Sequence, residues 1–258
     1  MLQPFHESNA SGHEYEGAED IFDQAYNVIS DLNLTNSLTA LYQEDPQFGS
    51  LVRSRRFAPE SIVANAEELA SNLYILVEGT VNLISMDPHG RRLVVSRLGS
   101  GAIFGEGEIL PPGEPNLYAE TEDEASVWII AASQARNVAL RYPILSWALL
   151  RTSSERLGQI VVNMESVAYR KLPERLAGLL LELSKPENAL TATGREKRER
   201  RMVGNISHQK LADTLGTYRE SVSALLRNLK SEGIVEIGYR WIRILDVEAL
   251  SDLANADY

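Results

Sequence analysis

The 258-residue chain has no cysteine and no long apolar run, and these absences exclude several classes of protein. Without cysteine it can form no disulfide, no thiolate metal site and no cysteine-ligated iron–sulfur cluster. No hydrophobic stretch approaches the roughly 20 residues that span a bilayer, and no signal-peptide pattern begins the sequence. These absences indicate a cytoplasmic protein without a membrane partner.

Groups that perform catalysis are also missing. We find no nucleophile paired with a base, no cluster of metal ligands and no glycine loop suited to cradle a phosphate. His6 and His13 lack the spacing of metal ligands, and His89 falls in a predicted hairpin turn. We therefore expect no enzymatic activity, no bound metal and no cofactor.

Positive charge is scarce in the first two thirds of the chain and concentrated in the last third. Residues 1–169 hold 10 Lys and Arg against 23 Asp and Glu, whereas residues 170–258 hold 15 against 13. Within 195–243 there are 11 basic and 6 acidic residues. Binding to phosphates requires such a local excess of cations, although a merely solvated basic face would give the same count. The acidic first part should face away from any nucleic acid.

The first 141 residues predict a disordered tail and a β-rich domain. Residues 1–17 are polar and acidic, which favours disorder, and short helices are expected over 19–31 and 35–42. From about residue 51 to 130, short apolar runs alternate with turn residues, the pattern of an antiparallel β-roll or barrel spanning 18–141. The predicted strands cover residues 57–58, 61–63, 73–77, 80–86, 92–98, 102–104, 117–119 and 126–130.

A long helix should follow from about Ile144 to Tyr169, after a short one over 133–140. Pro143 suits the first turn of a helix. Two interlaced heptad series form one stripe along the long helix, namely Leu150, Ser153, Leu157, Ile160, Met164 and Val167. Such a seam is typical of paired parallel helices, so we expect residues 142–170 to form a homodimer. The alternative is a stripe that packs against a core in the same chain.

The long helix should end at a hinge formed by Lys171, Leu172 and Pro173. Proline cannot continue the preceding hydrogen-bond ladder but can begin a new helix, here predicted over 174–183. Residues 171–258 would form a C-terminal domain. The charged segment 185–203 predicts a loop inside it.

Residues 207–230 have the pattern of two short helices joined by a tight turn. Ser207 is a helix-starting residue, Gly216 permits the left-handed backbone that ends a helix, and Thr217 can cap the next helix. The second helix would bury an apolar stripe and present polar side chains opposite it: Arg219, Glu220, Ser223, Arg227 and Lys230. This arrangement is the helix-turn-helix signature. A hairpin should follow, with Gly238-Tyr239 as a type II′ turn and Arg240 near the tip of the resulting wing.

An N-terminal β-roll, a long dimerisation helix, a hinge and a winged helix-turn-helix together resemble the cyclic-AMP receptor protein/FNR family of bacterial transcription regulators. The resemblance covers about residues 45–245. Its specific pieces are Tyr-Ile-Leu-Val-Glu-Gly at 74–79, Phe-Gly-Glu at 104–106, Pro143, and Arg-Glu-Ser-Val-Ser at 219–223. It implies an α+β fold in this order and a homodimer that binds double-stranded DNA.

The resemblance also implies how bases are read. Arg219 matches the arginine that contacts a guanine edge, Glu220 the glutamate that accepts from a cytosine amino group, and Ser223 the FNR-type serine that touches a base. The family's third arginine would fall at Ala224, so the half-site should be related to, but not the same as, TGTGA or TTGAT. Arg227 could contact a phosphate or take over part of the reading.

Further contacts to phosphate or at helix starts are expected from a wider set: Ser207, His208, Lys210, Thr217, Tyr218, Arg227 and Arg240. Amides and hydroxyls at helix starts bind phosphate, and cations do so at any position. Glu220 has an alternative role, because Thr217 and Glu220 also fit a capping box that would stabilise the second helix.

The effector pocket is where the sequence departs from the family. No Lys, Arg or His occurs from Leu98 to Ala135, so the arginine that neutralises the cyclic phosphate has no counterpart. Gly105 and Glu106 match pocket positions of the family, whereas Asn116 and Leu117 do not. An unpaired buried phosphate would cost several kcal/mol. We expect no binding of cyclic AMP.

Three possibilities remain for the sensor domain. It could bind another small molecule, apolar or cationic; it could have no effector; or it could hold haem, for which His6, His13 and His89 are poor axial ligands. The small number of matching pocket residues favours an effector-independent protein.

Two functions are compatible with the sequence. The first is a homodimeric transcription regulator that reads a palindromic site and contacts RNA polymerase, with activation and repression both open. The second is a ligand-binding regulatory module whose winged-helix domain mediates protein contacts. The basic balance of 195–243 and the polar face with Arg219 and Glu220 favour the first.

Overall fold

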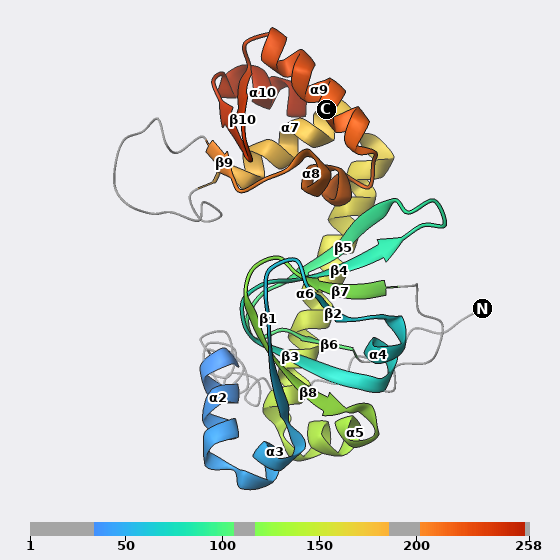
Figure 1. Ribbon diagram of the computed structural model, residues 1–258, viewed down its shortest axis with the longest axis vertical. Helices are drawn as coiled ribbons and strands as arrows, with labels where there is room; N and C mark the ends of the chain where they lie inside the picture. The colour runs from blue at the N-terminus through green and yellow to red at the C-terminus, as the bar shows by residue number, and fades with distance from the viewer. Residues whose placement is uncertain (1–33, 106–116, 186–201, 256–258) are drawn as a thin grey trace, which may run out of the picture.

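The computed structural model describes residues 34–105, 117–185 and 202–255. The predicted tail over 1–17 and the predicted helix over 19–31 lie outside these residues. A β-rich lobe and a smaller, mainly helical lobe are joined by one long helix, α6 (Pro143–Tyr169), as Figure 1 shows.

Two short helices precede the sheets. α2 (Leu34–Glu44) confirms the prediction for this segment, whereas α3 (Pro46–Leu51) was not predicted. Asp45 caps α3, because its Oδ1 accepts hydrogen bonds from the backbone N–H groups of Gln47 (2.8 Å) and Phe48 (3.1 Å). Together with Pro46 in the first turn, this cap allows a helix of only six residues.

Within the described residues, the β-rich lobe holds two four-stranded antiparallel sheets, which confirms the predicted roll. One sheet has the order β1-β8-β3-β6 and the other the order β2-β7-β4-β5. Helix α4 (Ala66–Ser71) was not predicted; it follows β2 and begins with a capping box between Asn65 and Glu68. The strands are β1 (Arg53–Phe57), β2 (Ile62–Ala64), β3 (Asn72–Glu78), β4 (Val81–Met86), β5 (Arg92–Leu98), β6 (Ile103–Phe104), β7 (Leu117–Thr121) and β8 (Ala125–Ala131).

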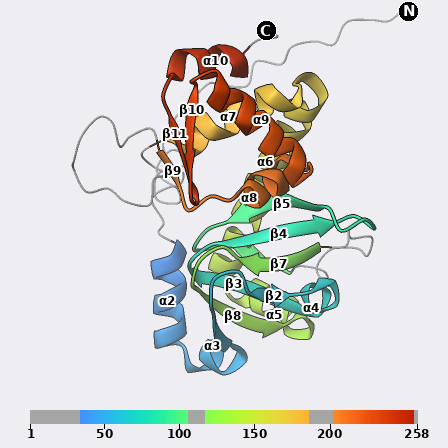
Figure 2. The same ribbon diagram turned by 45° about the horizontal axis from the view of Figure 1, so that its top comes forward.

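Strand β3 is buried on both faces, which explains its continuous apolar run. Tyr74 and Leu76 face the core between the two sheets. Leu73 and Ile75 face a second core, which the sheet shares with α2, α3, α5 (Ala132–Arg141) and α6. Helices therefore cover the outer face of one sheet, and the other sheet, with β4 and β5, faces the helical lobe (Figure 2).

Helix α6 is buried only in its first half. Leu145 and Ala148 join the helix-covered core. Thr152 is buried as well, because its Oγ1 donates to the Ala148 carbonyl (2.8 Å) and accepts from the Ile103 N–H (3.1 Å). The 27-residue helix is about 40 Å long at 1.5 Å per residue, so its second half extends beyond this core.

The helical lobe has its own hydrophobic core. Its helices are α7 (Leu172–Leu183), α8 (His208–Leu215), α9 (Arg219–Ser231) and α10 (Val247–Ala254), and its sheet has the order β10-β11-β9. β10 (Val235–Gly238) and β11 (Trp241–Ile244) form the predicted hairpin. β9 (Met202–Gly204) lies at the end of the segment predicted as a loop and pairs with β11. A segment of three residues is too short for its pattern to predict a strand. β9 forms because the edge of β11 is free to pair with it.

The hairpin turn differs from the prediction by one residue. Gly238 pairs with Trp241 inside the ladder, so Tyr239 and Arg240 form the turn. The left-handed backbone is at Arg240, with φ of 58°, rather than at the first turn position. The Trp241 indole lies over Gly238, where any Cβ would collide with the ring, and this keeps the glycine in the strand. The predicted type II′ turn at Gly238-Tyr239 is therefore wrong.

Candidate nucleic-acid interface

Helices α8 and α9 form the predicted helix-turn-helix. Ser207 is the N-cap of α8, and its Oγ accepts a hydrogen bond from the Lys210 N–H (3.1 Å). Gly216 ends α8 in the left-handed conformation, with φ 62° and ψ 41°. The N–H of Thr217 then donates to the Ala212 carbonyl (3.0 Å), which closes the turn tightly.

Thr217 does not cap α9. The N-cap residue is Tyr218, and its side chain makes no capping hydrogen bond. Because the Thr217 amide belongs to the turn that closes α8, the predicted capping box between Thr217 and Glu220 does not form. Glu220 is exposed in the first turn of α9, so the alternative role of its carboxylate in a capping box with Thr217 is not supported.

The two faces of α9 differ as predicted. Val222, Leu226 and Leu229 are buried in the core of the helical lobe. The opposite face has exposed and half-buried side chains, among them the predicted base readers and Ala224. The exposed ones are Arg219, Glu220, Arg227 and Lys230, and the half-buried ones are Ser223 and Ala224.

A hydrogen bond joins α8 and α9 on this surface. Nδ1 of His208, the first residue of α8, lies 2.8 Å from Oγ of Ser223. Burial lowers the pKa of the half-buried imidazole, and the cations Arg219 and Arg227 lower it further. His208 was predicted as a phosphate contact, and the sequence contained no signal that it would touch a predicted base reader.

Two other predicted phosphate contacts face a carboxylate of the β-rich lobe. Glu60 lies in the turn between β1 and β2, and its own φ is 58°. Its Oε1 lies 3.9 Å from Nζ of Lys210 and 3.6 Å from Nη2 of Arg240. The structure thus brings Lys210 and Arg240 together from α8 and the hairpin turn. The acidic part of the chain does not simply face away from this surface, contrary to the expectation from charge.

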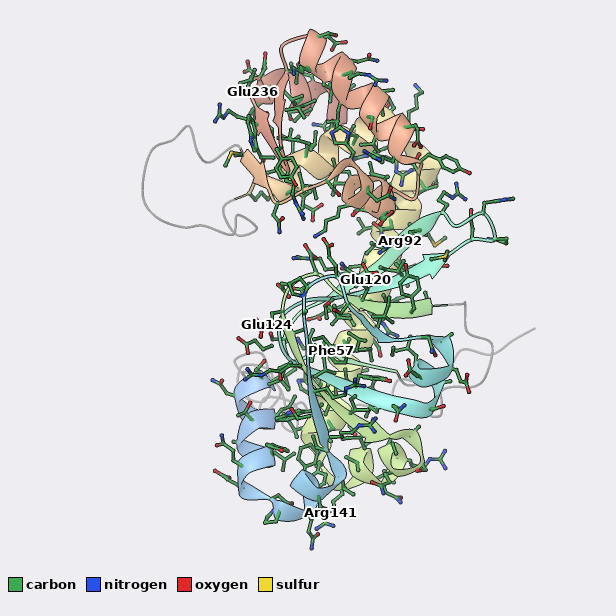
Figure 3. The ribbon with its side chains drawn as sticks, in the orientation of Figure 1. Phe57, Arg92, Glu120, Glu124, Arg141 and Glu236 are labelled. Atoms are coloured by element: carbon green, nitrogen blue, oxygen red, sulfur yellow. The ribbon has the colours of Figure 1, made fainter. Side chains whose placement is uncertain are left out.

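A second contact between the lobes centres on Arg92 of β5. Its Nη2 lies 2.7 Å from Oε1 of Glu120, and its Nε lies 3.1 Å from Oδ2 of Asp213 on α8. The latter is an ion pair without an aligned hydrogen bond. Burial raises the pKa of Asp213, although hydrogen bonding by Gln209 and the charge of Arg92 oppose the rise. Arg92 and Glu120 lie between the lobes, where α8 covers β5 (Figures 2 and 3).

The same contact extends to the turn of the helix-turn-helix. The guanidinium of Arg91 lies 5.6 Å from the ring centroid of Tyr218, and Leu93 packs closely against Gly216. Tyr218 was predicted as a contact at a helix start, and its ring is 52% exposed. Nothing in the sequence indicated these partners, because Arg91 and Tyr218 are far apart in the chain.

The predicted seam lies along α6 and is largely open to solvent. The exposed fractions are 57% for Leu150, 62% for Leu157, 67% for Met164 and 60% for Val167. Ile160 is 37% exposed, and Ser153 is half-buried. Apolar side chains of this size at heptad spacing are rarely left in water along a whole helix face.

The predicted effector positions are only partly described. Gly105 has φ of 80°, and a Cβ there would collide with the Asn72 carbonyl and the Tyr74 ring, so the fold itself requires this glycine. Leu117 packs against the core between the sheets. Glu106 and Asn116 lie outside the described residues.

A hollow of about 140 Å³ lies elsewhere, between β5, the loop 99–101 and α6. Two of its arginines are already paired: Arg97 with Glu122 and Arg151 with Glu155, each at 2.8 Å. We assign it no ligand.

Over the part of the chain that the structure describes, no helix is long and apolar enough to cross a membrane, and no three metal-ligating side chains cluster.

Comparisons with known proteins agree with this architecture. A cyclic nucleotide-binding domain model matches residues 54–142, and a Crp-like helix-turn-helix domain model matches residues 174–253. The transcriptional regulator SdrP of Thermus thermophilus is 29% identical over 183 residues, which cover 71% of this chain and 84% of SdrP. The probable transcriptional regulator flp of Lacticaseibacillus casei is 26% identical over 199 residues, covering 77% of this chain and 86% of flp.

Solved structures show the same fold. A CRP/FNR-family transcriptional regulator of Thermus thermophilus is 25% identical and superposes with a TM-score of 0.62, covering 80% of this chain and 100% of the other. With both domains matched in their order along the chain and the fold shared throughout, this protein belongs to the Crp/Fnr family of transcription regulators.

Proposed function

We propose that this regulator binds DNA as a homodimer at a palindromic site, which α9 reads in the major groove. One observation carries the proposal: the first turns of α9 present Arg219 and Glu220 to solvent, with Ser223 beside them, opposite the buried stripe. The planar fork of an arginine matches the O6 and N7 acceptors of guanine, and a carboxylate accepts from the cytosine amino group.

Phosphate contacts would come from residues around this face. The cations Lys210 and Arg240 both lie beside the Glu60 carboxylate. Arg227 lies further along α9. Ser207, His208, Thr217 and Tyr218 lie at the two helix starts, where N–H groups favour anions. These contacts would position the protein without selecting a sequence.

Dimerisation would use the stripe on α6. Its exposed members extend from Leu150 to Val167, beyond the half of the helix that the β-rich lobe covers. A parallel pair of such helices would relate two copies of α9 by a two-fold axis. The two half-sites would then lie about one helical turn of DNA apart, roughly 34 Å.

The hinge would lie between α6 and α7. Arg170 and Lys171 are extended, with φ/ψ of −121°/140° and −73°/160°, whereas Leu172 and Pro173, which were predicted as part of the hinge, lie in the first turn of α7. We propose residues 18–141 as the sensor-like domain, 142–170 as the dimerisation helix and 171–258 as the DNA-binding domain. A rotation at this short extended break would reorient the DNA-binding domain as a unit.

We further propose that cyclic AMP does not control this regulator. The absence of Lys, Arg and His from Leu98 to Ala135 supports this, since a cyclic phosphate would have no cation. Gly105 is one of the few residues that match the family pocket, but the fold itself requires a glycine at this position. The match at Gly105 therefore does not support nucleotide binding. The regulator would act without an effector, and would contact RNA polymerase as its family does.

The test is footprinting of genomic fragments by the purified full-length protein with no added ligand. We expect protection of discrete palindromes, nanomolar and salt-dependent affinity, and no change when millimolar cyclic AMP is added. Protection of no discrete site would favour a protein-docking module. DNA binding that requires cyclic AMP would overturn the effector-independent proposal alone.

A further inference from the structure

We propose that His208 is a positioning residue for base recognition: its imidazole holds the Ser223 hydroxyl in one orientation, and through it sets discrimination at one base pair. The inference rests on the proposed role of Ser223 as a base reader. It goes beyond the expectation that His208 contacts a phosphate.

A serine alone discriminates poorly between bases. Its side chain can occupy several rotamers, and its hydroxyl can both donate and accept. Serine therefore contacts bases of either kind. A partner that holds Oγ in place and occupies one of its hydrogen-bonding roles would remove this ambiguity.

His208 is such a partner. Its Nδ1 lies 2.8 Å from Oγ of Ser223, across the gap between the two helices of the helix-turn-helix. His208 begins α8 directly after the Ser207 cap, so its backbone is held while its ring reaches α9. Both side chains are half-buried, which limits competition from water for the hydrogen bond.

The state of the ring decides which role Ser223 keeps. When Nδ1 accepts the hydroxyl proton, Ser223 can only accept from a base amino group. When Nδ1 carries a proton and donates it to Oγ, the hydroxyl proton is left for a base acceptor, and one lone pair of Oγ also remains. The charged groups that face the ring from α9, Arg219 and Arg227, are both cations and favour the neutral imidazole.

The experiment is a double-mutant cycle with the full-length protein, combining His208→Ala and Ser223→Ala. Affinity is measured for the footprinted palindrome and for palindromes changed symmetrically at each position. Ser223→Ala identifies the base pair that Ser223 reads. We expect His208→Ala to reduce discrimination at that same base pair by about three- to tenfold, the effect of one hydrogen bond, and to cause no further loss in the double variant.

Two substitutions at the same position provide matched controls. The side-chain amide of asparagine can reach the place of Nδ1, whereas that of glutamine reaches the place of Nε2. We expect His208→Asn to retain discrimination and His208→Gln to lose it. Urea unfolding of each variant checks that the fold is intact, so that lost discrimination is not read from unfolded protein.

Several outcomes would overturn the inference. A uniform loss of affinity for all sequences, equal with and without Ser223, would make His208 a phosphate contact only. Loss of discrimination at a different base pair, or an additive double variant, would also contradict it. If Ser223→Ala changes no base preference, Ser223 is not a reader and the inference falls with that role. If the wild-type protein protects no discrete site, it is the proposed function that fails.

Discussion

Glu220 lies in the first turn of α9, one residue after the helix begins at Arg219. From sequence, its carboxylate had two competing roles, a helix cap and a base contact. Because Tyr218 rather than Thr217 is the N-cap residue, the capping box is not formed, and Glu220 supports α9 only as an acidic residue in its first turn. The carboxylate is thus free to face the groove in the proposed complex.

Replacing Glu220 by Ala should relax specificity at one base pair by about 1–3 kcal/mol and lower the melting temperature only slightly, because an exposed first-turn carboxylate stabilises a helix by less than about 1 kcal/mol. Competition binding with single base-pair variants of the palindrome measures the first effect, and thermal unfolding measures the second. Glu232→Ala, at the exposed far end of α9, is the control and should alter neither. A uniform loss of affinity together with a lower melting temperature would instead support a role as a cap.

Asp45 is a second residue whose structural role can be tested. Its Oδ1 caps α3, and its Oδ2 accepts a hydrogen bond from the Tyr142 hydroxyl (2.8 Å). The Tyr142 hydrogen bond, followed by the one from the Phe48 amide, holds the pKa of this carboxyl below its ordinary value, with burial opposing. The ionised carboxylate therefore ties the N-terminal helices to the start of α6.

We expect acid to remove this contribution. Because the folded-state pKa of Asp45 lies below the unfolded value of about 3.9, the stabilisation is present above that pH and is lost as the pH falls through the folded pKa. Asp45→Asn, which can still cap α3, should lower the melting temperature at pH 7 and show a smaller loss on acidification. Equal melting temperatures of wild type and variant at pH 7 would contradict the assignment.

Helix α6 has a buried first half and carries an apolar stripe that is exposed to solvent. Leu157 and Val162 offer a matched pair for testing the stripe, since they are 62% and 63% exposed but only Leu157 belongs to the heptad series. Burial of such side chains between two copies would contribute about 1.5–3 kcal/mol each.

Leu157→Glu should therefore dissociate the dimer and weaken binding to the full palindrome, because it places like charges at the seam. Val162→Glu should do neither. Sedimentation equilibrium measures the association, and binding to a half-site serves as the control for an intact DNA-binding domain. A dimer that survives Leu157→Glu but not Val162→Glu would show that another face of α6 forms the interface.

Elements with long apolar patterns were predictable, and those set by local chemistry or by a partner were less so. Most strands of the roll, α6 and the helix-turn-helix follow from periodicity and turn residues. β1 does not: it was predicted only at residues 57–58, because its sequence Arg-Ser-Arg-Arg-Phe has no apolar pattern. α3 and α4 are too short for apolar periodicity to predict them; their signals are local, Asp45-Pro46 for α3 and the Asn65–Glu68 capping box for α4. β9 had no signal of its own, because it forms only where β11 offers an edge.

The β-rich lobe contacts the surface of the helical lobe that we propose to bind DNA. Arg92 connects Glu120 with the buried Asp213 of α8. Glu60 lies beside Lys210 and Arg240, in the position where a phosphate would be neutralised. A DNA phosphate bound by these two cations would have to displace the Glu60 carboxylate or be repelled by it.

Replacing Glu60 by Gln should raise the affinity for all DNA sequences alike, because it removes this competing charge. Exposed ion pairs contribute up to about 1 kcal/mol, so the expected increase is about two- to fivefold at low salt and smaller at high salt. Glu67→Gln on α4 removes the same charge from another exposed place and controls for net charge. An affinity that does not change, or changes equally in both variants, would show that Glu60 leaves these cations before DNA binds.

The order of the domains and the base-reading candidates could be predicted from the residues alone, because these depend on short-range periodicity, turn residues and a local motif at 219–223. The cation-free stretch from Leu98 to Ala135 is likewise a property of the sequence itself. The contacts of His208 with Ser223, and of Glu60 with Lys210 and Arg240, arise only when the chain folds. The first pair joins the two neighbouring helices of the helix-turn-helix, and the Glu60 pairs join segments far apart in the chain. Polar contacts between different elements leave no periodic pattern, since each depends on how two surfaces finally pack.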